Sequence, residues 1–143
     1  MSKMLKPGRM ALFATLAIVL SGCSTTRPEV ELAESFAKQR AEMLSKIVPI
    51  ELNGYNLLRV KARGSEIEMT LFFTGKGDIS PIPLAKSIQG TYCRDQEIVS
   101  LLEQGLTYKL IFRDSRGKAV LARVIAIGDC LNAGIEPKEK GTP

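Results

Sequence analysis

The pattern that most constrains the fold is a strict alternation of side-chain character from Glu66 to Phe73. Ile67, Met69, Leu71 and Phe73 occupy one set of alternate positions, and Glu66, Glu68, Thr70 and Phe72 occupy the other. Successive side chains of a strand point to opposite faces of its sheet, so this pattern predicts a strand that is buried on one face only.

Two hairpins follow from the same reasoning. The stretch before this strand alternates as well, with Leu58, Val60 and Ala62 on one side and Leu57, Arg59 and Lys61 on the other. The turn residues Arg63-Gly64-Ser65 then join the two arms. A second hairpin is predicted from Thr107–Asp114 and Ala119–Gly128, joined by Ser115-Arg116-Gly117-Lys118. The last arm is apolar on both faces, so we expect it to be well covered.

Helices are predicted on either side of the first hairpin. From Glu31 to Val48 apolar residues recur at helical spacing, and Pro49 ends the pattern; these residues are Leu32, Phe36, Met43, Leu44 and Ile47. Glycines and prolines in Thr74–Pro83 predict a long surface loop. Leu84–Tyr92 is predicted as a short helix, and Asp95 as the N-cap of another that runs to Gln104.

These elements predict an α+β fold with an N-terminal amphipathic helix. Two β-hairpins form a four- to five-stranded, mainly antiparallel sheet packed against helices, with one disulfide. The outer face of this sheet is expected to be solvated and to carry mixed charges; its members are Arg59, Lys61, Glu68, Lys109, Arg113 and Arg123.

The N-terminus is typical of an export signal. Residues 1–22 contain no acid, and Lys3, Lys6 and Arg9 supply three of the five net positive charges of this 143-residue chain. An apolar run follows that is too short to span a bilayer comfortably. Leu20-Ser21-Gly22-Cys23 comes next and resembles the bacterial lipobox, in which the cysteine is acylated. The alternative is a plain secretory signal followed by a chance cysteine.

The lipobox resemblance implies lipidation at Cys23 with fatty acyl chains such as palmitate, a stable form of anchoring. The residue after Cys23 is Ser24 rather than an aspartate. By resemblance to lipoproteins of Gram-negative bacteria, this implies transport by the lipoprotein export machinery to the inner leaflet of the outer membrane, where the domain faces the periplasm. The predicted organisation is therefore a signal peptide (1–22), a lipidated N-terminus and tether (23–30), a domain (31–131) and a flexible tail (132–143).

Cys93 and Cys130 are then the two cysteines left in an oxidising compartment. An even pair there is expected to form a disulfide. The alternative, a redox-active or metal-binding pair, lacks a CxxC spacing and a histidine partner, because the chain has no histidine at all.

The sequence offers little for catalysis. Without histidine the common general base and the usual nucleophile systems are missing. Ser115 lies in the turn Arg113-Asp114-Ser115-Arg116 without a base, so turn chemistry explains it better than a serine site. No phosphate-binding loop or metal-ligand cluster is present in the sequence pattern. We therefore expect a binding protein that is not an enzyme and that takes no cofactor, metal, small-molecule substrate or nucleic acid.

The order of these motifs resembles the AspS-type (GspS-beta) pilotin lipoproteins of type II secretion systems. The resemblance covers the chain from Cys23 to Cys130 and rests on the amphipathic helix and on several short motifs: Val48-Pro49-Ile50, Gly54-Tyr55, Gly105-Leu106-Thr107-Tyr108 and Asp114-Ser115-Arg116-Gly117. It implies an outer-membrane lipoprotein that binds the C-terminal S-domain of the secretin subunit as a helix, carries it to the outer membrane and assists its multimerisation.

The groove for such a helix does not map onto a short motif. The candidates for partner binding are apolar side chains that the predicted core does not include: Phe72 on the otherwise polar strand face, and Ile79 and Ile82 in the predicted loop. The alternative function is a generic periplasm-facing lipoprotein interaction module, such as a hydrolase inhibitor or an envelope scaffold.

Overall fold

The computed structural model of the chain describes residues 27–75 and 79–132. The predicted signal peptide, Cys23 and nearly all of the predicted tail lie outside these residues. Within the described ranges nine elements follow one another: α1 (Pro28–Ser45), β1 (Ile50–Leu52), β2 (Tyr55–Arg63), β3 (Glu66–Phe73), α2 (Pro81–Tyr92), α3 (Gln96–Glu103), β4 (Thr107–Arg113), β5 (Ala119–Ile125) and α4 (Ile127–Asn132).

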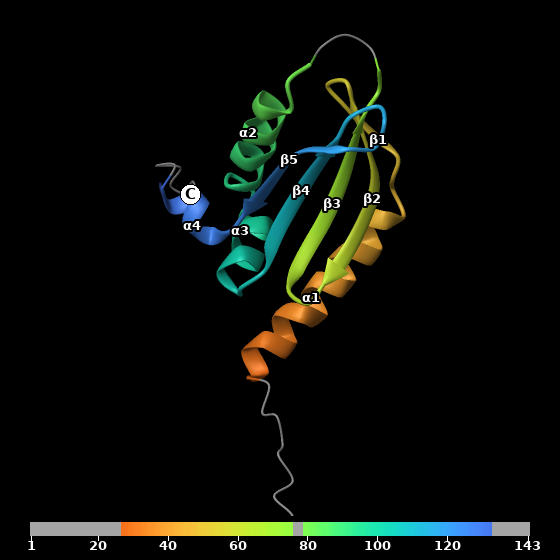
Figure 1. Cartoon of the computed structure of the whole chain (residues 1–143). Coiled ribbons are helices and arrows are strands. Elements are labelled where there is room, and N and C mark those ends of the chain that lie inside the picture. The colour runs from red at the N-terminus through yellow and green to blue at the C-terminus, as the bar shows by residue number, and fades with distance from the viewer. Residues whose placement is uncertain (1–26, 76–78, 133–143) are drawn as a thin grey trace, which may run out of the picture.

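The strands form one five-stranded sheet in the order of the chain, β1-β2-β3-β4-β5 (Figure 1). β2 pairs with β3 and β4 pairs with β5 as antiparallel hairpins, and β1 pairs antiparallel with β2. β3 and β4 are parallel, because α2 and α3 form the crossover that returns the chain to the same end of the sheet. The predicted α+β class and mainly antiparallel sheet are confirmed.

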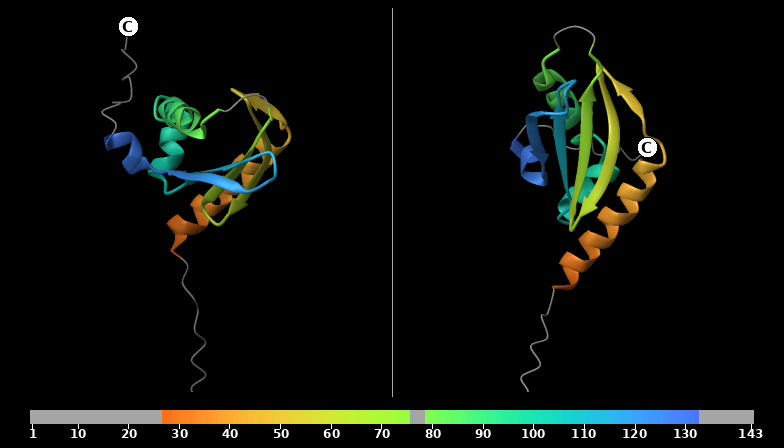
Figure 2. Two further views of the ribbon diagram at one scale, coloured as in Figure 1. Left: turned by 45° about the horizontal axis from the view of Figure 1, so that its top comes forward. Right: turned by 45° about the vertical axis from the view of Figure 1, so that its right-hand side comes forward.

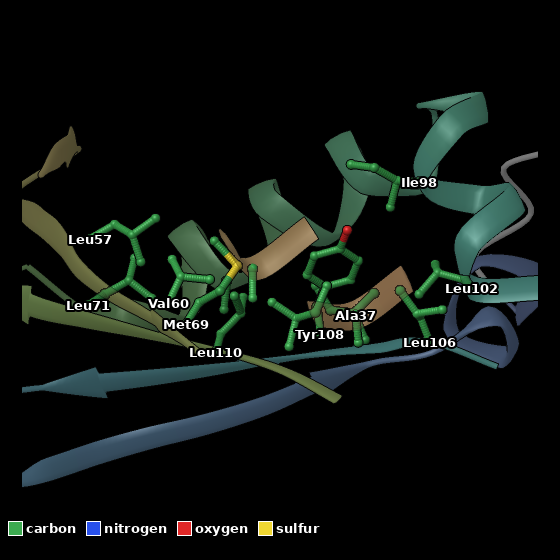
Figure 3. Close-up of a cluster of buried hydrophobic side chains, with 14 of the residues drawn as sticks. Ala37, Leu57, Val60, Met69, Leu71, Ile98, Leu102, Leu106, Tyr108 and Leu110 are labelled. Atoms are coloured by element: carbon green, nitrogen blue, oxygen red, sulfur yellow. The ribbon is translucent and has the colours of Figure 1, made fainter. Parts of the chain in front are cut away.

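The core lies on one face of this sheet, beneath the helices (Figure 3). Register places Ile67 beside Tyr108, Met69 beside Leu110, and Leu71 beside Phe112. These six side chains are all buried, as the alternation in β3 predicts. The opposite face carries the expected mixed charges. There Glu68 accepts a 3.1 Å bond from Arg63, and Lys109 lies 3.8 Å from Glu66. The placement predicted for Arg123 is wrong: this residue registers with the buried Leu110 and therefore lies on the core face, at the sheet edge.

The helices occupy different parts of the sheet. Helix α1 packs against β2 and β3, whereas α2 contacts β5 and α3 contacts α4, so three helices gather toward the β5 side (Figure 2). The predicted apolar stripe of α1 is only partly confirmed, because Phe36 and Leu44 pack against the core while Leu32 and Met43 are exposed. The fully buried residues of the helix are Ala33, Ala37 and Ala41. Small side chains at a spacing of four let this helix approach the sheet closely.

One prediction for β2 is wrong because of a β-bulge. The register with β3 shifts between Leu57 and Arg59. The extra residue, Leu58, therefore leaves the face of Val60, and it is 47% exposed. Leu57 takes the buried position instead.

The predicted cover over the last strand is also wrong. β5 forms an edge of the sheet, with Val120 and Val124 about half exposed. It ends at Ile125, three residues before the predicted end at Gly128, and the short helix α4 begins at Ile127. Ala126 donates its backbone N–H to Asp129 Oδ2 at 2.9 Å, which fixes this change of direction.

Helices begin where prolines and capping residues permit. Helix α1 begins at Pro28, three residues before the predicted start, and α2 begins at Pro81 in what was predicted as a loop. In both cases a proline occupies the first turn, where its missing N–H is harmless. The cap predicted for α3 is confirmed, because Asp95 Oδ1 accepts from the N–H groups of Glu97 and Ile98.

Candidate binding groove

Helix α2 presents two apolar faces to two different parts of the sheet. Leu84, Ser87, Ile88 and Thr91 recur at intervals of three and four residues and face β1 and the end of α1. Ile82, Ala85, Lys86 and Gln89 show the same spacing along another side, and this side faces β5. One helix therefore forms a wall of two separate recesses.

The larger apolar recess, called the groove below, lies between α2 and the α1–β1 segment. Its floor is the buried set Leu57, Met69 and Leu71 from β2 and β3. One wall is the first face of α2. The other wall and the ends are formed by Leu44, Ile50, Leu52, Asn53 and Tyr92.

The groove has the chemistry of an apolar binding site. None of its described lining residues is charged, and the polar ones sit at its rim or already have partners. Thr91 Oγ1, for example, donates to the Ser87 carbonyl at 3.0 Å. The volume is about 330 Å³, roughly twice that of a cavity of about 150 Å³ which holds one benzene molecule. Two large apolar side chains of a partner would fit.

Tyr92 closes one end of the groove and is held in place by the core. Its hydroxyl donates to Met69 Sδ at 3.4 Å, and its ring meets that of Tyr108 edge-on at 4.8 Å between centroids. Burial is the main reason that the pKa of Tyr92 rises to about 12, and Tyr108 adds to the effect. The side chain is therefore neutral across the physiological pH range.

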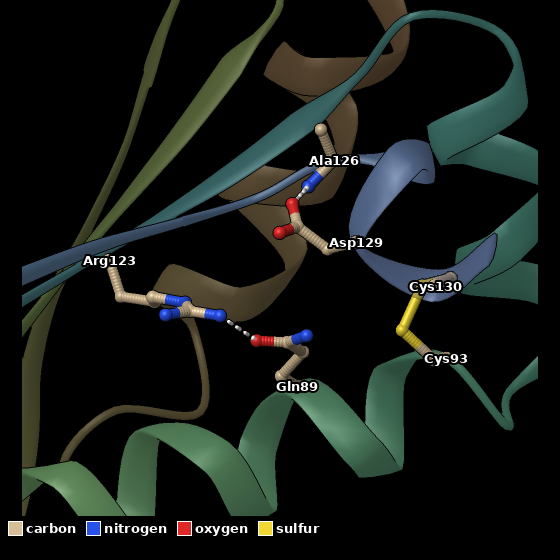
Figure 4. The surroundings of a disulfide bond; sticks show 6 residues. All are labelled: Gln89, Cys93, Arg123, Ala126, Asp129 and Cys130. Carbon is tan, nitrogen blue, oxygen red and sulfur yellow. Dashed lines mark hydrogen bonds between the residues drawn. A yellow bond between two sulfur atoms is a disulfide. The ribbon is translucent and has the colours of Figure 1, made fainter. Parts of the chain in front are cut away.

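A disulfide fixes the C-terminal end of α2. Cys93, which caps the helix, is bonded to Cys130 of α4, and both residues are buried (Figure 4). The bond connects α2 to the segment that follows β5, across a sequence separation of 37 residues. The wall shared by both recesses is thus covalently tied to α4, the helix that follows the edge strand β5.

The three residues predicted to bind a partner lie in three different places. Phe72 is half-buried on the charged face of the sheet, away from the groove, where it registers with Asn56 and Arg113. Ile79 lies in a recess that adjoins the end of the groove and shares Asn53, Leu84 and Ser87 with it. Its carbonyl accepts a 2.9 Å bond from Tyr55 Oη.

Ile82, the third, is 53% exposed and lines the recess toward β5. Three groove residues, Ser87, Ile88 and Thr91, were not predicted to bind a partner, although their spacing with Leu84 is visible in the predicted helix. Because Pro81 and Pro83 indicate a loop in the sequence, the first turn of α2 was not predicted. Without that turn, the separate faces of α2 toward β1 and toward β5 could not be recognised.

No group of three or more Cys, Asp or Glu side chains is placed to hold a metal ion in the ranges 27–75 and 79–132. Within the same ranges, no helix is both long and apolar enough to cross a membrane.

Comparison with known proteins identifies the family. The family model for the type II secretion system (T2SS) pilotin, S protein, matches residues 29–130. The chain belongs to this family. Pilotin AspS 2 from Escherichia coli O78:H11 is 29% identical over 114 residues, which cover 77% of this chain and 82% of that protein. Lipoprotein YghG from Escherichia coli K12 is 28% identical over the same length and coverage.

A solved structure extends the similarity to the fold. The type II secretion pilotin EpsS from Vibrio vulnificus superimposes with a TM-score of 0.66 at 24% identity, covering 71% of this chain and 94% of that one. This likeness concerns the fold. Together with the family match, it confirms the AspS-type resemblance found in the sequence.

Proposed function

We propose that this pilotin-family chain is an outer-membrane lipoprotein that binds the C-terminal S-domain of a type II secretion secretin as a helix. In this proposal it carries the secretin subunit to the outer membrane and assists assembly of the multimeric pore. It acts by binding, without catalysis. The observation that supports the proposal is the uncharged groove beside α2, found in a chain of the pilotin family.

The groove suits an amphipathic helix better than an extended segment. Its two walls stand over a floor of buried Leu57, Met69 and Leu71, so a ridge of apolar side chains can enter between them. An amphipathic helix presents such a ridge at i, i+3, i+4 and i+7. A segment that orders only on binding couples its folding to capture, which suits delivery of an unassembled subunit.

The direct test uses the full chain, purified in detergent, and the isolated C-terminal segment of the secretin. Pull-down measures the binding, and circular dichroism measures the helix content of the mixture against the sum of its parts. We expect binding with a gain in helix. No binding at micromolar concentrations, with the disulfide intact, would contradict the proposal and favour the generic lipoprotein interaction module.

We also propose that Cys23 is the acylated residue and that the chain is anchored in the inner leaflet of the outer membrane. The lipobox-like sequence supports this, and the name of one relative, a lipoprotein, is consistent with it. Mass spectrometry of the mature N-terminal peptide is expected to show a triacylated Cys23. A Cys23→Ser chain should accumulate unprocessed; processing of this variant at the same bond would contradict the assignment.

A further inference from the structure

The two edges of the sheet differ in how well they are protected from another strand. At one edge β1 has three residues and follows Pro49, which has no N–H to offer. At the other edge β5 has seven residues, without proline and without an acid, and Arg123 is its single charged residue. A long edge without proline is a template for an added strand, and one positive charge on it favours a strand that carries an acid.

The second recess lies directly beside this edge. It is a pocket of about 200 Å³ between α2 and β5, lined by Ile82, Ala85, Lys86, Leu121 and Arg123. One side of the pocket is formed by Leu121 and Arg123, the side chains of β5 that lie on the core face of the sheet. A strand added next to β5 would project every second side chain toward the same space. Backbone pairing and a side-chain pocket thus occur together.

The charge of the pocket selects among possible occupants. Lys86 and Arg123 are exposed, and neither forms a salt bridge with any described residue. Arg123 donates to the neutral Gln89 Oε1 at 2.8 Å, as Figure 4 shows. The nearby Asp129 carboxylate is already bonded to the Ala126 N–H. The pocket is therefore apolar inside and positively charged at its rim.

A second copy of the chain fits this rim poorly. If two β5 strands paired antiparallel about Ala122, each Arg123 would lie opposite Leu121 of the other copy. Both arginines and both Lys86 side chains would then share one face of the joined sheet, with no carboxylate among the pocket residues. Like charges brought together in this way oppose association.

We propose that the β5 edge docks an extended, acidic peptide segment of a partner protein. The segment pairs with β5 as a sixth strand and places an apolar side chain in the pocket against α2. A carboxylate two residues away on the same face lies at Lys86 and Arg123. This site is separate from the groove, so it leaves the groove free for a helix.

The probe is a synthetic nine-residue peptide with valine and threonine at alternate positions and leucine and glutamate between them. It is titrated to millimolar concentration into the full chain in detergent, and amide chemical shifts and hydrogen exchange are recorded by NMR. We expect shifts at residues 119–125 and on the Ile82 side of α2, with slower exchange of β5 amides. The groove residues should not respond.

Matched controls separate backbone pairing from charge. A peptide with lysine in place of glutamate should not bind, and N-methylation along its pairing edge should also abolish binding. Lys86→Glu and Arg123→Glu, both exposed, should each weaken binding by about two- to fivefold. Lys109→Glu, on the opposite face of the sheet, should have no effect.

Three results would overturn the proposal. The first is that the acidic and basic peptides bind equally, and the second is that the chemical shift changes map to the groove. The third is that the full chain sediments as a dimer whose β5 amides are protected from exchange without peptide. The last result would assign the edge to a second copy. Each of them can occur whether or not the secretin segment binds, so this proposal and the proposed function fail independently.

Discussion

The two sides of helix α2 share a helix but differ in every property that decides recognition. Toward β1, the groove is uncharged and has a buried floor supplied by the centre of the sheet. Toward β5, the pocket is smaller, has two cations at its rim, and borders an open strand edge. A partner's helix suits the first recess and a partner's strand the second, because the edge strand beside the first has only three residues and follows Pro49, whereas the edge strand β5 beside the second has seven.

The difference shows that sheet position determines what a surface can recognise. Both recesses contain isoleucine and leucine, so their apolar lining residues alone would not separate them. The groove sits over the interior strands β2 and β3, each of which has a neighbouring strand on both sides. The pocket sits at β5, where one side of the backbone has no neighbouring strand.

Removal of the disulfide is expected to have the largest effect and to damage the β5 side more than the groove. Closing a loop of this length contributes up to about 4 kcal/mol in the chain-entropy model. Cys93→Ser with Cys130→Ser should therefore lower the free energy of unfolding by about 2 to 4 kcal/mol, measured by urea denaturation. Amide exchange should accelerate most in α4 and β5; uniform acceleration over both sides of α2 would contradict the comparison.

Alkaline pH is expected to act on the groove side through Tyr92. The pKa of Tyr92 is about 12 in the folded chain, against about 10 when unfolded. The unfolded state thus loses the proton first, so stability is constant below pH 10 and falls as pH rises toward 12. The full loss is about 2.7 kcal/mol for two pKa units. Denaturation with urea at pH 9 to 12 measures it.

Tyr92→Phe is the control for this pH dependence. The substitution should remove most of the fall between pH 10 and 12. A smaller fall should persist from Tyr108, whose pKa burial also raises. An unchanged slope in the variant would show that Tyr92 is not the group responsible.

A pair of glycines gives a smaller and more local test. Gly54 (φ +83°) and Gly117 (φ +83°) have the same left-handed backbone. A Cβ at Gly54 would lie 2.5 Å from Ile79 Cδ1, whereas a Cβ at Gly117 would meet nothing within 4 Å. Each alanine substitution should cost about 1 to 2 kcal/mol through its backbone. Only Gly54→Ala should also displace Ile79 at the end of the groove.

The measurement is thermal unfolding together with amide shifts around Ile79. Equal losses of stability with no shift at Ile79 in either variant would mean that the contact seen in the structure does not hold that side chain. Movement of the groove residues in the Gly117→Ala chain would contradict the separation of the two regions.

The sequence predicted the elements that are buried on one face. The alternation from Glu66 to Phe73 is visible because one face of β3 is core and the other meets solvent. The fold class and the disulfide partners also followed from local patterns and cysteine count. The alternation failed at Leu58, since a bulge depends on the register of the neighbouring strand rather than on the residues themselves.

The candidate site was less predictable because it is assembled from distant segments. The floor of the groove comes from β2 and β3 and its walls from α1, β1 and α2, so no short motif contains it. The apolar residues of β5 were misinterpreted as buried, because composition does not say whether a strand is interior or at an edge. Of the predicted binding residues, Ile79 adjoins the groove, while Phe72 and Ile82 lie elsewhere.

The most direct test of the central claim uses two isoleucines on opposite sides of α2. Ile88 lines the groove and Ile82 lines the pocket toward β5. Ile88→Asp and Ile82→Asp introduce the same charge on the same helix. Binding of the secretin C-terminal segment to each full chain is measured by calorimetry. Because Ile88→Asp could unfold the chain, a second pair of variants is measured as well: Ser87→Arg at the groove rim and Ser115→Arg in the β4–β5 turn.

We predict that Ile88→Asp and Ser87→Arg weaken binding at least about tenfold, the loss expected when a charge is forced into an apolar contact. Ile82→Asp and Ser115→Arg should bind like the unmodified chain. Equal binding by Ile88→Asp, Ser87→Arg and the unmodified chain, or a loss confined to Ile82→Asp, would contradict the assignment of the groove as the helix-binding site.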